Sequence, residues 1–588
     1  MNHKRRSWWQ VLATLVAFTL ISAACGGGNG DDAATDTTLP PQGLIGGDDD
    51  EGEGEGSDDG SSPEYGGRIV VAVEAETENW LPGEADFVVP SGSSIAHTIY
   101  DPLMILNEDE ELRPYLAESM EPNDDLTEWT LTLRPDITFH DGSPLDAETL
   151  VWNFETLHDQ PGSNSAGSIA NNGIEEVEAV DDLTVVYRLS GPNAAMADSL
   201  RSSLGWPVSR QAYEEMGADE FAENPVGTGP FEFQQWTRDD RLVVTRNENY
   251  WRTDEDGNEL PYLDEVEFRP ITDEDSRYQS LAADSVQVMV TLRGSTAKQV
   301  LSLAEERNYR GNLYYGNQSG SSIFNTERPP VDDRRVRRAL VAASDGEAVA
   351  IVLGDDGLVP PTNQFFNDES RWYSEEAAEA YPSADGPDLE LADELITEYV
   401  NDPDRSDGKA PGEPVEVEYA CPPDPSLIEI GQLYQQAWGS LGGGGMVEVS
   451  LRQVEQPELV GNAIDGDYMI NCWRAGAGAG DPLTALQSFF SDPENNPLNF
   501  TNFSHPEIDE ALVDLRTNSD FEVRYEAAET INRIANENSI MTWSIATPTL
   551  VGWRDDIHGL TTWRLPDGDL GDGTAGGHMH FSQVWLEQ

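Results

Sequence analysis

Residues 414–473 alternate between strand and helix patterns, and this order constrains the fold more than any other segment of the 588-residue chain. Apolar residues alternate with polar ones, as in strands, in the stretches 415–421 (VEVEYAC), 446–454 (MVEVSLRQV) and 467–473 (DYMINCW). Helical spacing predicts a short helix near 457–464 and a longer one over 426–441, with its apolar face at Leu427, Ile430, Tyr434, Trp438 and Leu441. A β-α-β-α-β order predicts right-handed crossovers and a parallel sheet, with ligands bound beyond the carboxyl ends of the strands.

Two of the three cysteines, Cys421 and Cys472, occur at the carboxyl ends of the first and third of these strands. If the two strands are neighbours, their ends lie about 4.8 Å apart, within the window of roughly 4.4–6.8 Å between Cα atoms that a disulfide needs. An even pair of cysteines in an oxidising compartment favours the bond. We therefore predict a Cys421–Cys472 disulfide, which two free thiols in secreted material would contradict.

Other strands and helices are predicted on either side of this segment. The strands are 68–73, 128–134, 183–189, 241–246 and 264–271. One helix covers 147–157 after Asp146, a good N-cap residue, and has Leu150, Phe154 and Leu157 on one face. Another covers 332–343, with Val336, Ala339, Leu340 and Ala343 at the same spacing.

The N-terminus has the pattern of a secretory signal. Three basic residues stand among the first six, and an apolar run over 11–24 is short for a bilayer span and ends in small residues. The sequence SAAC at 22–25 resembles a bacterial lipobox, although Ser22 stands where Leu is usual. We predict a lipoprotein signal peptide over 1–24 and lipidation of Cys25, with a plain signal peptide as the alternative.

Residues 25–64 are rich in Gly, Asp and Glu and nearly lack apolar side chains, so we expect a disordered tether. The roughly 520 residues that follow are too many for one core, so two or three packing units are expected. The chain has 110 acidic and 34 basic residues, and its net charge of −76 excludes nucleic-acid binding through phosphates. We interpret the acidity as a solubilising surface, with attraction of cationic solutes as the alternative.

Five segments, in order, resemble family 5 of the extracellular solute-binding proteins of ABC importers, the peptide/nickel type. They are 99–157 (with YDPL, PYLAES and FHDG), 224–251 (with PVGTGPF and NENYW), 324–345 (with DRRVRRAL), 468–482 and 505–515. The resemblance runs from about residue 68 to residue 543.

The resemblance implies an α/β, two-lobed periplasmic-binding-protein-like fold of class II, the large peptide-binding type. Two crossovers would join the lobes, which close on a solute. Lobe I would comprise 65–95, 225–322 and 545–588, with an extra subdomain at 96–224, and lobe II would comprise 323–544.

The resemblance further implies that, in peptide-binding relatives, an Asp three residues after a Trp pairs with the α-ammonium of the ligand. Trp473 is present, but Gly476 stands at the Asp position, so the anchor is missing or displaced to Asp481. A buried ammonium without a counter-charge is costly, so a missing anchor disfavours peptides with free N-termini. Arg474 adds a planar donor fork suited to a carboxylate or sugar hydroxyls, with a surface salt bridge as the alternative.

Three further motifs favour structural roles. The stretch 227–231 (GTGPF) lacks the spacing of a phosphate-binding loop and predicts a tight turn. His140 precedes Asp-Gly, a strong turn signal, and is interpreted as a turn residue. His578 and His580 are too few for a convincing metal site, and an exposed tail is expected there.

These observations predict a monomeric, lipid-anchored receptor on the extracytoplasmic face of a bacterial membrane that delivers a small solute, first of all a peptide, to an ABC permease. Ligand contacts are expected from Trp473, Arg474 and Asp481 in lobe II, and from Ser91, Ser93 and Ser94 of a loop in lobe I. No catalytic residue, metal or cofactor is predicted. An oligosaccharide or another polar metabolite is the alternative solute, and a secreted hydrolase or an adhesion module is the alternative class.

Overall fold

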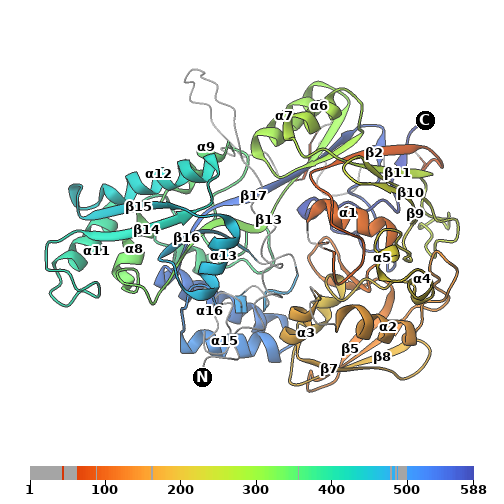
Figure 1. Cartoon of the computed structure of the whole chain (residues 1–588), viewed down its shortest axis with the longest axis horizontal. Helices are drawn as coiled ribbons and strands as arrows, with labels where there is room; N and C mark the ends of the chain where they lie inside the picture. The colour runs from red at the N-terminus through yellow and green to blue at the C-terminus, as the bar shows by residue number, and fades with distance from the viewer. Residues whose placement is uncertain are drawn as a thin grey trace. The chain divides into compact units, whose positions relative to one another are not determined.

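The computed structural model describes residues 43–45, 62–85, 87, 89–159, 163, 165–354, 357–476, 480–483, 486–487 and 499–588, and these divide into two compact units. Unit 1 consists of Arg293–Ser295 and Tyr315–Pro548, and unit 2 of the described residues 43–292, Thr296–Tyr314 and Thr549–Gln588. The chain passes between the units within two long strands, β13 (Tyr309–Phe324) and β17 (Met541–Arg554) (Figure 1). The predicted signal peptide, Cys25 and most of the predicted tether lie outside the described residues.

The sheet of unit 1 has the parallel strands predicted from the sequence. Its order is β15-β14-β16-β13, in which β14 (Val415–Cys421) pairs in parallel with both β15 (Val447–Gln453) and β16 (Ile470–Gly476). The connecting helices are α12 (Pro425–Gly439), which lies against β14 and β15 (Figure 1), and α13 (Gln456–Asp465). The β-α-β-α-β prediction is therefore confirmed.

Helix α12 forms where the sequence places its start signal and its apolar face. The Asp424 side chain accepts hydrogen bonds from the first backbone N–H groups, and Pro425 occupies the first turn. Tyr434 and Trp438 are buried and stack with their ring centroids 4.8 Å apart. Trp438 Nε1 donates to the Leu340 carbonyl at 2.9 Å, which ties α12 to α8. Further helices of unit 1 are α8 (Arg334–Ala342), α9 (Gly346–Leu353), α10 (Glu375–Glu379), α11 (Leu389–Asn401), α15 (Pro506–Thr517) and α16 (Phe521–Asn538).

The main sheet of unit 2 is built around a buried central strand, β2 (Arg68–Val73). The strand order is β17-β12-β2-β11-β10-β9, and β2 is parallel to both of its neighbours. Every residue of β2 after Arg68 is buried, as expected for a strand covered on both faces. The elements that surround it are α1 (Pro90–Ile99), β9 (Phe231–Thr237), β10 (Arg241–Arg246), β11 (Glu265–Pro270), α6 (Glu274–Ala282), β12 (Val288–Thr291) and α7 (Gly294–Glu306).

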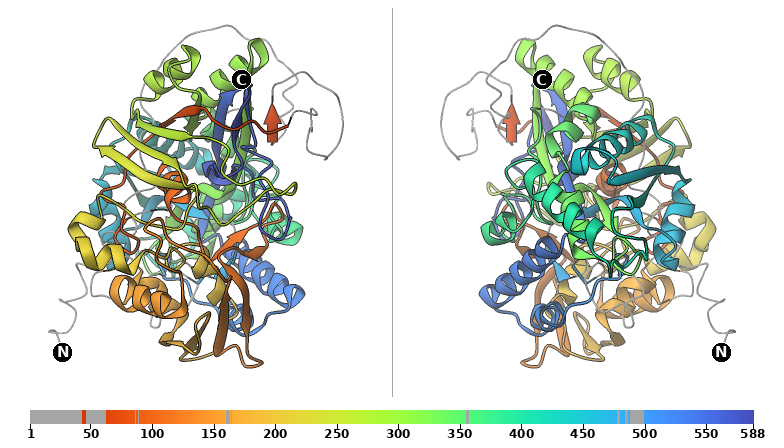
Figure 2. Two further views of the ribbon diagram at one scale, coloured as in Figure 1. Left: turned by 90° about the vertical axis from the view of Figure 1, so that its right-hand side faces the viewer. Right: turned by 90° about the vertical axis from the view of Figure 1, so that its left-hand side faces the viewer.

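Unit 2 contains a second hydrophobic core within the range 96–224. A four-stranded antiparallel sheet of order β5-β6-β8-β7 packs with α2 (Ala147–Asn153), in the orange to yellow part of Figure 2. Asp146 caps α2 by accepting from Thr149 N at 2.8 Å, as the sequence predicts. The strands are β5 (Ala117–Pro122), β6 (Glu128–Leu133), β7 (Ile174–Ala179) and β8 (Thr184–Leu189).

The remaining elements of unit 2 are short. They are β1 (Gly43–Ile45), β3 (Met104–Leu106), β4 (Leu112–Pro114), α3 (Ala166–Asn172), α4 (Arg210–Met216), α5 (Ala218–Phe221), β18 (Ile557–His558) and β19 (Trp585–Leu586).

Two of the motifs discussed above pack against each other in unit 2. His140 Nε2 lies 3.0 Å from the Gly229 carbonyl, and the His140 backbone N–H donates to the Gly227 carbonyl at 2.9 Å. A Cβ at Gly227 would lie 2.2 Å from the Ile99 carbonyl oxygen, so only glycine fits there. The turn role predicted for His140 is confirmed, whereas residues 228–230 form a bend that leads into β9.

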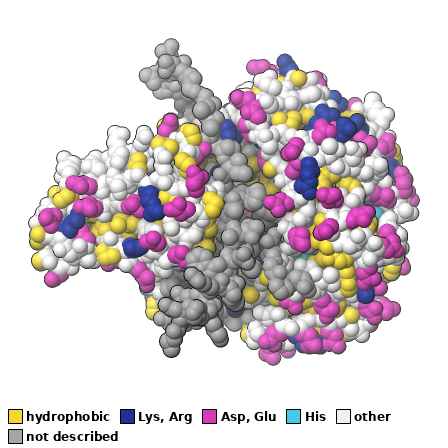
Figure 3. All heavy atoms as spheres, in the orientation of Figure 1, with side chains coloured by type: hydrophobic (Ala, Val, Ile, Leu, Met, Phe, Trp, Pro, Cys, Tyr) yellow, Lys and Arg dark blue, Asp and Glu magenta, His cyan; other side chains and the backbone are white. Residues whose placement is uncertain are grey.

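Asp and Glu side chains are spread over the face shown in Figure 3, with fewer Lys and Arg between them. Within the part of the chain that the structure describes, no helix has both the length and the apolar character that a bilayer span needs.

Candidate functional site

The carboxyl end of the parallel sheet in unit 1 holds the two body cysteines and Trp473. Cys421 and Cys472 are joined by a disulfide, with their Cα atoms 5.3 Å apart. Trp473 follows on β16, is 8% exposed, and packs its ring on Phe500 with the centroids 5.2 Å apart. Arg474 is half-buried and stands opposite Gly320 of β13. Trp473 and Arg474 lie in the middle of β16, beyond the residues that pair with the carboxyl end of β14, which is the side of the sheet where open α/β sheets bind ligands.

Asp481 is engaged by an arginine of its own unit. Both of its carboxylate oxygens accept from one terminal nitrogen of Arg524, at 2.8 and 2.6 Å, and the two side chains are only 9% and 11% exposed. Asp481 Oδ1 also accepts from Leu483 N at 3.0 Å. The Asp481 carboxylate, which the sequence analysis considered as a displaced ammonium anchor, is therefore already neutralised by Arg524. The Gly- and Ala-rich residues 477–479 before it lie outside the described residues.

The three serines predicted to lie on a loop of lobe I belong to helix α1 instead. Pro90 begins the helix, a position where its missing N–H and fixed φ suit the first turn. Ser91, Ser93 and Ser94 are all buried. The Ser94 hydroxyl accepts from Met579 N at 3.1 Å, and Ser93 Oγ lies 3.2 Å from His97 Nδ1. The loop prediction was wrong because tertiary packing overrides the weak helix propensity of Ser and Gly.

Glu74 is a partly buried acid beside the start of α1 that the sequence analysis did not single out. It directly follows β2, and its Oε1 accepts from Ser91 N at 3.3 Å, whereas Val89, the N-cap residue of α1, offers no side-chain cap. Burial raises the pKa of Glu74, an effect opposed by hydrogen bonds from the backbone, by Arg277 and by the Ser91 hydroxyl. An acidic residue directly after the predicted strand 68–73 was the signal that could have drawn attention to it.

The segment His578–His580 is packed into unit 2 and is not an exposed tail. His580 is buried between the rings of His97, at 4.0 Å between centroids, and Trp563, at 3.9 Å. Met579, between the two histidines, is completely buried. The expectation of an exposed tail was therefore wrong, because Met579 and the His580 ring are buried against α1.

Burial sets the charge states in this histidine cluster. It lowers the pKa of His97 to about 3 and that of His578 to about 4, and it places the pKa of His580 well below its usual value. Burial also raises the pKa of the neighbouring Asp572 to about 7, with Arg201 opposing the shift. At neutral pH the three imidazoles are therefore uncharged.

Asp101, from the YDPL motif, is the centre of a second buried polar group in unit 2. It accepts hydrogen bonds from Trp251 Nε1 at 2.8 Å, from Tyr250 OH at 3.0 Å and from Thr228 Oγ1 at 3.3 Å. Burial raises its pKa to about 7. Both carboxylate oxygens have partners, so this group ties the second core to the main sheet and is not a candidate ligand site.

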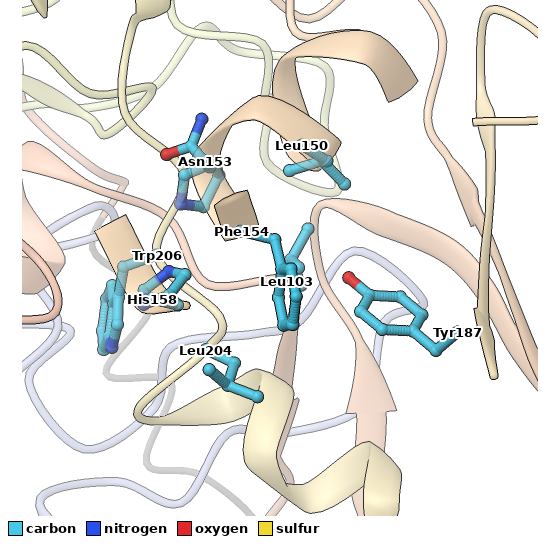
Figure 4. Close-up of a pocket in the computed structure, with 9 residues that line it drawn as sticks. Leu103, Leu150, Asn153, Phe154, His158, Tyr187, Leu204 and Trp206 are labelled. Atoms are coloured by element: carbon cyan, nitrogen blue, oxygen red, sulfur yellow. The ribbon is translucent and has the colours of Figure 1, made fainter. Parts of the chain in front are cut away.

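The other candidates for small-molecule binding are weak. A pocket in unit 2 has a free volume of about 10 Å³, which suits a single water. It is lined by Leu103, Leu150, Asn153, Phe154, His158, Tyr187, Leu204, Trp206 and Pro207 (Figure 4). Among the described residues, no group of three or more His, Cys, Asp or Glu side chains is arranged to hold a metal ion.

Comparison with known families identifies the class of protein. The profile described as "Bacterial extracellular solute-binding proteins, family 5 Middle" matches residues 111–497. The chain therefore belongs to the family 5 bacterial extracellular solute-binding proteins, which are binding proteins and not enzymes.

The individual proteins with similar sequences share only about a quarter of their aligned residues with this chain. The glutathione-binding protein GsiB of Salmonella paratyphi A is 27% identical over 310 residues, which are 52% of this chain and 58% of that protein. GsiB of Salmonella typhi shows the same identity and coverage. The chain thus aligns with little more than half the length of the curated relatives that it matches.

Solved structures confirm the fold class predicted from the sequence. The ABC transporter substrate-binding protein CtaP of Listeria monocytogenes superimposes with a TM-score of 0.71 at 21% identity, covering 89% of this chain and 100% of that one. The oligopeptide-binding protein AppA of Bacillus subtilis, in complex with a nonapeptide, gives a TM-score of 0.66 at 19% identity, covering 90% and 100%. The fold is the mixed α/β fold of the class II, peptide-binding type.

Proposed function

We propose that the chain is the solute receptor of an ABC importer and that its solute is a peptide. The observation that carries the proposal is the family match over 111–497, because this range contains the parallel strands β14–β16 and the β16 residues Trp473 and Arg474. The names of the relatives support a peptide: GsiB is named for glutathione, and AppA was solved with a nonapeptide.

The ligand contacts follow from the chemistry of the predicted residues. Trp473 offers an aromatic face, Arg474 a donor fork for a peptide carboxylate, and the strand end at Gly476 a backbone without side-chain obstruction. Asp481 positions its own loop through Arg524.

The receptor acts outside the cytoplasmic membrane as a monomer, held there by a lipid on Cys25 and by the acidic tether that follows. The net charge of −76 keeps the protein off an anionic lipid surface. Its protein partner is the permease of the importer, which recognises the solute-loaded state.

Native mass spectrometry of the protein purified from cells, followed by calorimetry with a panel of short peptides, tests the proposal. A retained peptide mass, saturable heat without product formation, and a rise in melting temperature with peptide concentration are expected. Peptide at about 100 times its Kd stabilises the folded state by about 2.7 kcal/mol. An oligosaccharide or other metabolite that binds when no peptide does, or any turnover, contradicts it.

A further inference from the structure

Glu74 and Ser91 place two buried polar atoms without hydrogen-bond partners on the same side of α1. Glu74 Oε1 is used by Ser91 N, but Glu74 Oε2 has no partner, and neither has Ser91 Oγ. Ser91 is 1% exposed. The hydroxyl is close enough to lower the pKa of Glu74, yet neither atom has a partner in hydrogen-bonding geometry. Buried polar atoms are nearly always paired, so this pair requires an explanation.

Within the described part of the chain, Glu74 forms no ion pair. Arg277 is the basic residue that acts on it electrostatically, but each of the three Arg277 nitrogens donates to another group. Its Nε donates to the Val290 carbonyl at 3.0 Å, one terminal nitrogen donates to the Ile271 carbonyl, and the other pairs with Glu274. A buried carboxylate without a bonded cation is unfavourable until a charged partner arrives.

The acids near the end of β16 offer no replacement for the missing ammonium anchor. Gly476 has no side chain, and the Asp481 carboxylate is held by Arg524. Among the described residues at this end of β16, neither position therefore offers an unpaired carboxylate to an amine of the solute. Glu74 lies at the carboxyl end of β2, the corresponding ligand-binding edge of the parallel strands in unit 2.

We propose that Glu74 Oε2 and Ser91 Oγ bind a protonated primary amine of the solute, an assignment that rests on the proposed function. An ammonium group has three donors and no acceptor, and both atoms accept. The pair on Glu74 is a charge-assisted hydrogen bond, whereas an anionic group would be repelled. Glu74 Oε1 continues to cap α1, so capping and binding use different oxygens of one carboxylate.

The test compares peptides of identical sequence with a free or an acetylated N-terminus, by calorimetry on the wild type, Glu74→Gln, Ser91→Ala and the control Glu78→Gln. The amide introduced by Glu74→Gln keeps an acceptor for Ser91 N and removes the charge, and Glu78 is an exposed acid on the same segment. Glu74→Gln is expected to weaken binding of the free-amine peptide roughly 10- to 100-fold and to leave the acetylated peptide unchanged. Ser91→Ala weakens the free-amine peptide by a smaller factor, and Glu78→Gln has no effect.

Each other outcome has a distinct meaning. If Glu74→Gln is folded by circular dichroism and binds both peptides as the wild type does, Glu74 is only a cap and the assignment is overturned. If Glu74→Gln does not fold, Ser91→Ala decides, and equal affinity for the two peptides overturns the assignment. A solute retained from cells that lacks an amine also overturns it while leaving the receptor role intact. Protein that retains no solute and binds nothing in the panel overturns the proposed function and the assignment with it.

Discussion

At the scale of single residues, the Asp481–Arg524 pair separates a structural role from a ligand-binding one. We expect Asp481→Asn to lower the free energy of unfolding by about 3–5 kcal/mol, because Arg524 is left buried without its counter-charge. Peptide affinity is expected to stay within about twofold, a shift of roughly 0.4 kcal/mol. Urea denaturation measures the first quantity and calorimetry the second.

The matched control is an exposed pair, Arg210–Glu214, in which Glu214→Gln should change stability by no more than about 1 kcal/mol. A stable Asp481→Asn protein that no longer binds free-amine peptides would instead make Asp481 the ammonium anchor.

The Cys421–Cys472 bond is a second test at this scale. The two residues are 51 positions apart, so the chain-entropy relation gives a contribution of about 4 kcal/mol. We expect reductant to lower the denaturation midpoint of the wild type and to leave a Cys421→Ser/Cys472→Ser double variant unchanged. Non-reducing peptide mapping should recover the two cysteines in one cross-linked peptide, and two alkylated thiols in the native protein would refute the bond.

Predictions about single residues were right where the two residues lie on neighbouring strands of one sheet. The first and third predicted strands are neighbours, as the pairing of Ala420 with Asn471 shows, but Cys472 is the third residue of β16 and not at its carboxyl end, because the strand begins and ends three residues later than predicted. The partner of Asp481 is 43 residues away on another helix, and no periodicity in the sequence connects the two. Glu74 follows a predicted strand, where ligand-binding residues are expected in open α/β sheets. It was not singled out, because the chain has 110 acidic residues and a single acid does not stand out among them.

At the scale of elements, the contact between α1 and the 572–580 segment predicts an acid-sensitive packing. His97 has its pKa lowered to about 3, so the unfolded chain binds a proton below pH 6.5 that the folded chain excludes. Its stabilising effect is complete above pH 6.5 and is lost as the pH falls from 6.5 toward 3. His578 and His580 act in the same direction, whereas Asp572, with its pKa raised to about 7, acts in the opposite one.

Because the four groups titrate over overlapping pH ranges, the role of His97 is measured by comparing the acid-induced loss of stability in a variant with that in the wild type. Between pH 7 and pH 5, His97→Phe should lose about 1–2 kcal/mol less stability than the wild type. Denaturant midpoints at the two pH values measure this loss. His505→Asn, which changes a histidine outside the cluster, should behave as the wild type, and an acid loss in His97→Phe equal to that of the wild type would disprove the role of His97.

Elements with strong local signals were predicted almost to the residue, and those formed by tertiary packing were missed. Strands β2 and β10 match the predicted ranges, and Asp146 caps α2, because alternation and capping are local. Helix α1 begins with Pro-Ser-Gly-Ser-Ser, a run of weak helix formers that is helical only because its buried side packs on the core of unit 2. The burial of the segment around Met579 could have been predicted from the sequence, since the apolar residues Met579 and Phe581 alternate with His578 and His580.

At the scale of the whole molecule, chain order predicted the architecture because the family arranges its segments in a fixed sequence. The described residues form two units connected through β13 and β17, and unit 2 has a second core between residues 96 and 224. The exact lobe boundaries stay predictions, as do the lipid and the tether, which lie outside the described residues.

Membrane attachment is the remaining prediction for the whole molecule. The described residues include no helix able to span a bilayer, and 110 acidic residues against 34 basic ones disfavour adsorption to anionic lipid. If the proposed lipid on Cys25 is the anchor, we expect Cys25→Ser to shift the protein from the membrane pellet to the supernatant and from the detergent to the aqueous phase of a detergent partition. Intact mass of the wild type should show an N-terminus at Cys25 carrying a diacylglyceryl group. Wild-type protein found mainly in the medium with an unmodified N-terminus would establish a plain signal peptide, and Cys25→Ser that stays in the pellet would require a different anchor.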